Sequence, residues 1–282
     1  MSWLFPFVAA WLLTGLLVRL APRLALLDAP ESAPERKWQR GPVPRVGGIV
    51  LAFGLAWTTR HTQLYALVAA FAVGLADDLV PRGLPRALKF ALEAAVCALF
   101  ASAYRGSPAL GFALAAGALA AANTFDNADG ALTSLGCAAL GPIAPAAAAL
   151  LGGFLPWNLW QRADDSRPRA YLGDSGSHLV GLLLACDPRS ALFLVLPALD
   201  LARLSWLRWR VGSRPWTGDR RHLAHRLQAR GLRPTAVVFV LLVLASPAFF
   251  LPPLWAVGAT AVLFGAAVSL TPDPCPGPAS AG

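Results

Sequence analysis

The sequence predicts an all-α, polytopic transmembrane protein, a helical bundle of about 9 to 11 helices. Hydrophobic residues make up 56% of the 282 residues and charged residues only 14%, whereas a soluble domain carries about 25% charged residues. Apolar runs alternate along the chain with polar loops that are rich in arginine. The formal net charge of +9 fits cytoplasmic loops beside anionic lipid headgroups, and we expect no nucleic-acid partner.

The expected spans follow from the order of apolar runs and basic loops. Residues 3–20 predict a first span with its N-terminus outside, because the positive charges Arg19 and Arg23 follow the apolar run instead of preceding it. Basic loops over residues 28–45 and 203–233 are expected in the cytoplasm. The other full spans are expected over residues 46–59, 63–76, 87–103, 108–122, 235–250 and 253–270.

Two connections are too short for two full crossings each. Residues 130–158 would reach about 42 Å as a helix, whereas two crossings of the hydrocarbon core need about 60 Å. We therefore expect a short hairpin that is broken at Gly141-Pro142, with Pro145 opening its second arm. Residues 177–200 carry Asp187 in their middle and predict a second short hairpin, buried against other helices.

The distribution of positive charge supports this layout. Only Arg60, Arg105 and Arg189, out of 24 Lys and Arg residues, fall outside, as the positive-inside tendency requires. We expect one transmembrane domain over residues 1–270, in the inner (plasma) membrane with its C-terminus in the cytoplasm. The tail, residues 271–282, is rich in Pro, Gly and Ala and is expected to be disordered.

Three apolar segments each end in acidic or amide side chains. The residues concerned are Asp77, Asp78, Asn123, Asp126, Asp129 and Asp174. Ionisable groups at the border of a bilayer span usually face a polar cavity and mark a substrate or ion site. A divalent metal that serves phosphates takes one or two protein carboxylates together with phosphate oxygens and water. We therefore expect these residues to meet at the cytoplasmic face around a metal ion and a diphosphate.

Two further features suit an anionic ligand. Gly173 and Gly176 flank Asp174, where they let the backbone approach a ligand and start a helix whose N-terminus favours anions. His222 and His225 lie three positions apart among arginines, a cationic group that suits a diphosphate if the segment is helical. The alternative is structural, with aspartates and arginines that only lock loops and cap helices.

Other polar groups carry weaker signals. Glu93 lies one turn after Lys89 in an apolar helix, so an ion pair on that helix face is at least as plausible as a catalytic role. His178 stands alone, and we assign it no role. The four cysteines are scattered along the chain and are interpreted as small apolar residues.

A set of short motifs runs along nearly the whole chain. They are Arg36-Lys37, Gly47-Gly48, Gly74 to Asp78, Lys89, Asn123 to Gly130, Gly153 to Asn158, Gly173 to Ser177, Pro197 to Asp200 and Asp219 to His225. The ordered set resembles the polyprenyl-phosphate N-acetylhexosamine-1-phosphate transferases of glycosyltransferase family 4, which include undecaprenyl-phosphate GlcNAc-1-phosphate transferases. The resemblance implies transfer of a sugar 1-phosphate from a UDP-sugar such as UDP-GlcNAc to a polyprenyl phosphate. It implies Mg²⁺ as cofactor, with Mn²⁺ as an alternative, release of UMP, and a first membrane step in making a cell-envelope polysaccharide.

The resemblance also implies roles by matched position. Asn123 and Asp174 resemble the metal ligands, and Asp77 and Asp78 resemble the pair that positions or deprotonates the lipid phosphate. The other implied roles are catalytic for Asp126, Asp129, His222 and His225, and substrate-binding for Lys37, Lys89, Asn158, Arg220 and Arg221.

The chain departs from the family pattern at three positions. Gln39, Ala120 and Ala224 stand where family members often have histidine, asparagine and histidine. These departures and the shortened hairpins leave the transferred sugar open. They also leave open a catalytically weak relative that binds prenyl phosphate. A transporter of an anionic lipid is the second alternative, although its charges would lie nearer the midplane. Membrane lipids are expected partners, and a homodimer is left open.

Overall fold

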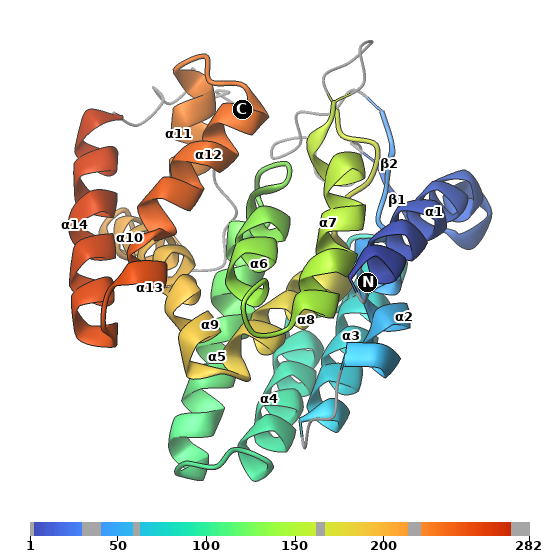
Figure 1. Ribbon diagram of the computed structural model, residues 1–282, viewed down its shortest axis with the longest axis horizontal. Helices are drawn as coiled ribbons and strands as arrows, with labels where there is room; N and C mark the ends of the chain where they lie inside the picture. The colour runs from blue at the N-terminus through green and yellow to red at the C-terminus, as the bar shows by residue number, and fades with distance from the viewer. Residues whose placement is uncertain (1–2, 30–40, 59–62, 162–166, 214–220, 272–282) are drawn as a thin grey trace.

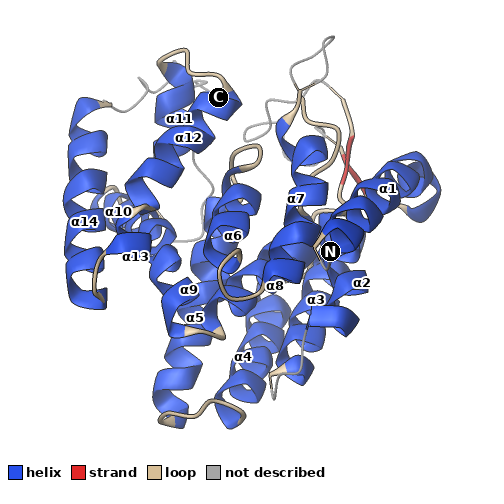
Figure 2. Ribbon diagram, in the orientation of Figure 1, coloured by secondary structure: helices blue, strands red, loops and turns tan. Residues whose placement is uncertain are grey.

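The computed structural model describes residues 3–29, 41–58, 63–161, 167–213 and 221–271. This part of the chain is mostly helical, as Figure 2 shows, which confirms the predicted all-α class. Among the described residues, strand pairing between named strands occurs once, where Leu27–Asp28 (β1) and Val43–Pro44 (β2) pair antiparallel. Helices α1 and α14 lie at opposite edges of the bundle (Figure 1).

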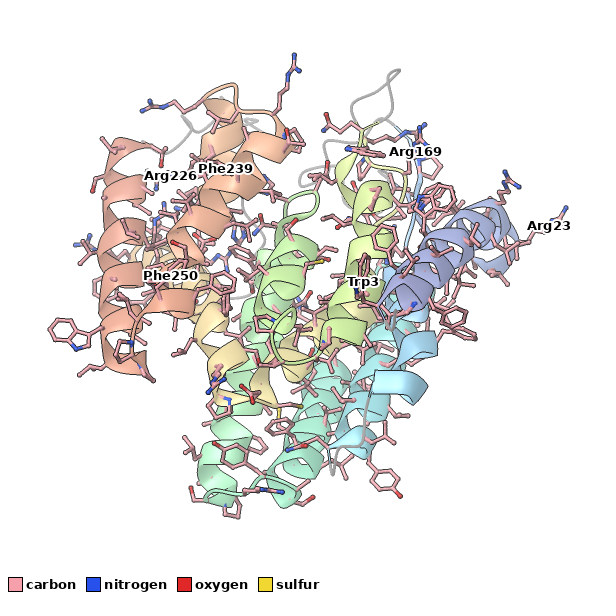
Figure 3. All side chains as sticks on the ribbon, viewed as in Figure 1. Trp3, Arg23, Arg169, Arg226, Phe239 and Phe250 are labelled. Carbon is pink, nitrogen blue, oxygen red and sulfur yellow. The ribbon has the colours of Figure 1, made fainter. Side chains whose placement is uncertain are left out.

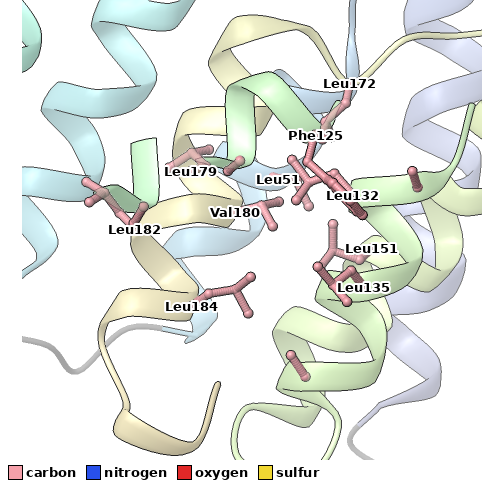
Figure 4. Close-up of a cluster of buried hydrophobic side chains, with 14 of the residues drawn as sticks. Leu51, Phe125, Leu132, Leu135, Leu151, Leu172, Leu179, Val180, Leu182 and Leu184 are labelled. Carbon is pink, nitrogen blue, oxygen red and sulfur yellow. The ribbon is translucent and has the colours of Figure 1, made fainter. Parts of the chain in front are cut away.

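Helix α8, Gly173–Ala185, is the centre of the bundle. It packs between α3, Leu64–Leu79, and α5, Pro108–Phe125. Leu179 and Val180, which are neighbours in sequence, are both fully buried within a cluster of leucines (Figure 4). A helix that is buried on all sides carries apolar residues all round, so α8 can hold polar residues only at its ends or opposite polar partners.

The other helical elements come before or after α8 in the chain. On the N-terminal side they are α1 (Leu4–Leu20), η1 (Ala21–Leu24), α2 (Gly47–Thr58), α4 (Arg86–Ser102), α6 (Ala131–Leu140) and α7 (Pro145–Leu159). On the C-terminal side they are α9 (Pro188–Ala191), η3 (Leu192–Leu194), α10 (Val195–Arg210), α11 (Leu223–Ala229), α12 (Pro234–Ala245), α13 (Pro247–Phe250) and α14 (Pro253–Leu270).

The first short hairpin is confirmed. Helix α6 ends at Leu140, a turn covers residues 141–144, and Pro145 is the first residue of α7. Proline suits this position because the first turn of a helix needs no N–H donor and its fixed φ is already helical. The two arms pack against each other, and α7 also packs against α1.

The second short hairpin is wrong in its second arm. Helix α8 ends at Ala185 as expected, but α9, η3 and α10 then form a helical run that continues to Arg210. The predicted loop over residues 203–233 is therefore helical at its start, and α11 adds a further helix within it. Leu196, Asp200, Leu204 and Arg208 are buried at every fourth position of α10. This buried stripe continues the helix past arginines that suggested a loop.

Four described segments are long and apolar enough to cross a membrane. They are Leu4–Leu24, Pro108–Phe125, Pro188–Arg210 and Pro253–Leu270. The expected spans over residues 46–59, 63–76 and 87–103 correspond to helices of 12, 16 and 17 residues, which are shorter than these four segments. Many large apolar side chains are exposed on the outside of the bundle, and Figure 3 shows Arg23 extending away from it beyond α1. These features define a helical membrane protein.

Candidate active site

The junction of α3 and α8 is built around the carboxylate of Asp78. Its Oδ1 accepts the backbone N–H of Asp174 at 3.0 Å, and its Oδ2 accepts the backbone N–H of Ser175 at 3.0 Å and the Ser175 hydroxyl at 2.7 Å. Gly173 has a φ of +77°, and a Cβ there would lie 2.7 Å from Asp78 Oδ2. The N-terminus of α8 thus binds an anion, as predicted, but the anion is the protein's own carboxylate.

Lys89 joins two carboxylates from segments far apart in the sequence. Its Nζ lies 3.1 Å from Asp77 Oδ2 and forms a close ion pair with Asp174 Oδ2. Asp77 Oδ1 accepts the backbone N–H of Leu84 at 2.8 Å, which also fixes the turn between α3 and α4. The prediction that the ends of these segments meet is confirmed for Asp77, Asp78 and Asp174, and Lys89 joins Asp77 to Asp174.

The end of α5 completes the acidic cluster. Asn123 Oδ1 accepts the Ser177 hydroxyl at 3.4 Å, which links the last turn of α5 to the first turn of α8. Asp126 follows the last residue of α5. Burial raises the pKa of Asp126 well above its usual range, and the charges of Asp174, Asp78 and Asp129 raise it further. Negative charge therefore gathers at this point of the molecule.

Asp129 lies at the edge of the cluster, in the turn before α6. Its Oδ2 accepts a hydrogen bond from Gln161 Nε2 at 3.5 Å. Burial raises the pKa of Asp129 to about 7, and the hydrogen bond from Gln161 opposes that effect. Near neutral pH this carboxyl group is therefore able to exchange a proton.

The donor set fits a hard divalent cation such as Mg²⁺. Among the residues that the structure describes, no three His, Cys, Asp or Glu side chains form a ready-made metal site. Mg²⁺ needs no such cage, since it is usually held by one or two carboxylates with phosphate oxygens and water. Asn123 and Asp174 offer oxygen atoms, and the charges of Asp174, Asp78 and Asp129, which raise the pKa of Asp126, would attract a cation to this point. The metal-ligand roles stay predictions.

Sequence reasoning missed Arg45, which adds a second cation. Its Nη1 lies 3.7 Å from Asp78 Oδ1 and donates to the Asp78 carbonyl at 3.4 Å, while its Nη2 pairs with Asp28. The backbone N–H of Arg45 donates to the Leu26 carbonyl at 2.8 Å. The signal for Arg45 was its place two residues before Gly47-Gly48, where the chain enters α2.

Asn158 is part of the internal scaffold. Its side chain accepts the Thr133 hydroxyl at 2.7 Å through Oδ1 and donates to the Ala170 carbonyl at 3.1 Å through Nδ2. Only 2% of the residue is exposed. These contacts join α6, α7 and the segment before α8, so the substrate-binding role implied for Asn158 gains no support from this geometry.

The histidines form a second polar cluster between α10 and α11. His222 Nδ1 lies 2.9 Å from Asp200 Oδ2, and His225 Nδ1 lies 3.2 Å from Gln228 Oε1. The two imidazole rings form a T-shaped pair with centroids 5.8 Å apart. This contact confirms that they share one side of the segment. The carbonyl of Arg221 accepts from Arg203 Nη1 at 2.7 Å. Lys37 and Arg220 lie outside the described residues.

Glu93 and His178 form a pair that the helix-face prediction did not include. Lys89 bridges to Asp77 and Asp174, as described above, and Glu93 Oε1 instead lies 3.2 Å from His178 Nε2. The ion pair between Lys89 and Glu93, one of the two alternatives for Glu93, is therefore replaced by these contacts. The new pair connects α4 to α8 one turn beyond the Lys89 bridge.

Fold and site together define a helical membrane protein with a buried acidic centre at the ends of its helices. No family model matches the chain. It is 28% identical to the undecaprenyl-phosphate alpha-N-acetylglucosaminyl 1-phosphate transferase of Salmonella typhi, over 85% of this chain and 80% of that protein. The transferases of the same name from Escherichia coli K12 and Yersinia pestis are each 26% identical, over 81% of this chain and 76% of theirs.

These matches confirm the resemblance that the motifs indicate. The chain is similar to the undecaprenyl-phosphate alpha-N-acetylglucosaminyl 1-phosphate transferases over most of its length. The matches span most of both chains, so they cover the helices that carry the acidic cluster. Together with the apolar helices, they identify the chain as an integral membrane protein.

Proposed function

We propose that this chain transfers a sugar 1-phosphate from a UDP-sugar to a polyprenyl phosphate and releases UMP. The names of its relatives make N-acetylglucosamine 1-phosphate and undecaprenyl phosphate the first candidates. One observation carries the proposal: Lys89 lies between Asp77 and Asp174, with Asp78 and Asp126 close by. An acidic centre with one lysine suits a diphosphate and a divalent cation at once.

The two neighbouring aspartates have different tasks. Asp78 is committed to the amides and hydroxyl at the start of α8, and only 2% of its side chain is exposed. The side chain of Asp77 is 14% exposed and makes fewer internal contacts. Asp77 is therefore the better-placed group to accept a proton from the lipid phosphate or to orient it, while Asp78 builds the site around it.

The transfer needs no covalent enzyme intermediate. An oxygen of the lipid phosphate attacks the β-phosphorus of the UDP-sugar, the bond from that phosphorus to the bridging oxygen breaks, and UMP leaves with the bridging oxygen. Lys89 and the histidine cluster are the groups that stabilise the negative charge on the phosphates. When bound, Mg²⁺ or Mn²⁺ would neutralise phosphate charge, with Asn123 and Asp174 as the residues that hold it.

The proposed site faces the cytoplasm of a bacterial inner membrane, where it would begin a cell-envelope polysaccharide such as a lipopolysaccharide. The basic loops support this orientation through the positive-inside tendency. A catalytically weak relative that binds prenyl phosphate is the alternative, because Ala120 and Ala224 replace polar residues frequent in the family.

The test is UMP release by detergent-purified protein with undecaprenyl phosphate, Mg²⁺ and a panel of UDP-sugars supplied one at a time. We expect one of the UDP-sugars to give UMP release, and we expect that release to require both the lipid and the metal. Asp174→Asn should lower the rate by about 100-fold or more. The control is Asp187→Asn, which changes a carboxylate that caps α9 through the backbone N–H of Arg189. No release with any donor, from protein that melts cooperatively, would favour the non-catalytic relative.

A further inference from the structure

Asp200 is a buried carboxylate to which neither the motifs nor the proposed reaction assigns a role. It lies in the middle of α10 and is 2% exposed. Its Oδ2 lies 2.9 Å from His222 Nδ1, and its Oδ1 accepts the backbone N–H of Leu223 at 3.2 Å. A carboxylate buried in a membrane protein is costly unless its hydrogen bonds are satisfied. Both oxygens of Asp200 therefore serve one short segment, His222 and Leu223.

The contact with Nδ1 determines that this ring nitrogen carries a hydrogen. A carboxylate oxygen can only accept, so Nδ1 of His222 must carry the hydrogen. The other ring nitrogen, Nε2, is then the atom left for a ligand. The second bond holds the backbone directly after the ring, because Leu223 is the first residue of α11. Ring and backbone are thus fixed by a single side chain.

Arg203 completes this arrangement. Its Nη1 lies 3.7 Å from Asp200 Oδ1 and donates to the Arg221 carbonyl at 2.7 Å. Arg203 is one turn after Asp200 on α10, so one helix presents both a carboxylate and a guanidinium to residues 221–223. The backbone on both sides of His222 is therefore tied to α10.

We propose that Asp200 is the positioning residue for His222: its carboxylate accepts the Nδ1–H and supports the imidazolium form of the ring, whose Nε2–H is directed to the phosphates of the donor. The proposal rests on the proposed function, because it assigns His222 a ligand. A helix cap alone would not need this geometry. Asp187 caps α9 with one oxygen on a backbone N–H, whereas Asp200 adds a contact with a ring nitrogen.

The experiment compares Asp200→Asn with the matched control Asp187→Asn in the full-length protein. In Asp200→Asn an amide NH₂ replaces one oxygen, so the side chain can no longer accept from both His222 and Leu223. If it keeps the bond to Leu223, its NH₂ faces Nδ1, which must then accept. The ring is then neutral with its hydrogen on Nε2 and brings no positive charge to the phosphates. We expect kcat for UMP release to fall about 10- to 100-fold, with the KM for the UDP-sugar within about threefold of wild type. Asp187→Asn should leave both unchanged.

A spectroscopic measurement separates positioning from simple support of the fold. The chain has four histidines, so ¹⁵N-labelled histidine gives few signals, and His222→Gln identifies the one from His222. The wild type should show hydrogen on both Nδ1 and Nε2 of His222, and Asp200→Asn should leave hydrogen on Nε2 alone. A wild-type signal from the Nε2 form would overturn the proposal whether or not the variant folds, as would an unchanged form in the variant.

The outcomes also separate this proposal from the proposed function. A wild-type protein that releases no UMP contradicts the transferase function, while the ¹⁵N signals still decide whether Asp200 fixes His222. An active wild type with an equally active Asp200→Asn contradicts the positioning role and leaves the transferase function standing.

Discussion

Asp129 is the residue whose environment gives the clearest pH dependence. Burial raises its pKa from 3.8 to about 7. The folded protein therefore keeps a proton that the unfolded chain releases, and folding loses stability as pH rises from about 4 to about 7. One pKa unit corresponds to about 1.4 kcal/mol, so the loss has an upper bound of about 4 kcal/mol, which solvent near the partly exposed carboxyl lowers.

Asp129→Asn removes this charge, and we expect it to stabilise the protein above neutral pH. The melting midpoint without added divalent metal should be about 2 to 6 °C higher than wild type at pH 8. At pH 4.5, where wild-type Asp129 is mostly protonated in the folded state, the difference should nearly vanish. A difference that is the same at both pH values would show that the carboxyl group does not titrate in this range.

The residues of the site were easier to predict than their partners. The aspartates stand out because carboxylates are rare at the ends of apolar runs. Lys89 and Glu93 have the spacing of an ion pair on one helix face, yet Lys89 bridges to Asp174 and Glu93 faces His178. Helix-face pairs contribute only about 0.2 to 0.5 kcal/mol. Buried carboxylates on neighbouring helices compete strongly for the same cation, and that competition depends on packing.

At the scale of elements, small residues allow α3 and α2 to approach the start of α8. A Cβ on Gly74 would lie 2.5 Å from the Asp174 carbonyl oxygen and 2.5 Å from the Ser175 backbone nitrogen. A Cβ on Gly48 would lie 2.5 Å from the Gly176 backbone nitrogen. Backbone atoms cannot yield as a flexible side chain can, so these glycines set how closely the helices approach.

Gly74→Ala should therefore separate α3 from α8 and weaken the hydrogen bonds from α8 to Asp78. We expect a loss of about 1 to 3 kcal/mol in the free energy of unfolding. We also expect the folded variant to release UMP more slowly than wild type, because Asp77 and Asp78 move with α3. The control is Gly117→Ala in α5, where a Cβ would meet no atom within 4 Å and alanine favours the helix. Equal melting midpoints for the two variants would contradict this role of Gly74.

Elements were predictable where chain length alone decides the geometry. The break between α6 and α7 follows from a connection that is too short for two crossings, and Pro145 marks the start of the second arm. The extension of α10 to Arg210 did not follow from composition, because its arginines indicated a loop. Its buried stripe includes Asp200 and Arg208, and polar residues become tolerable inside a bundle only when partners from other elements satisfy them.

At the scale of the whole molecule, the acidic cluster lies at one end of the helices that carry it. Helix α4 has 17 residues, is about 25 Å long, and carries Lys89 in its first turn. Helix α5 returns from the turn at residues 103–107 to Asn123 and Asp126. Figure 1 shows this turn at the lower edge of the bundle. Arg86 at the start of α4 and Arg105 in the turn therefore lie at opposite ends of one helix.

These two exposed arginines give a matched test of the proposed orientation. In a background with all four cysteines replaced by alanine, Arg105→Cys should react with a membrane-impermeant maleimide added to intact cells. Arg86→Cys should react only after the cells are permeabilised, because the basic loops favour the cytoplasmic side. Labelling of both variants in detergent shows that each thiol is accessible. The reverse pattern would place the acidic cluster outside, away from nucleotide sugars in the cytoplasm, and would contradict the proposed donor.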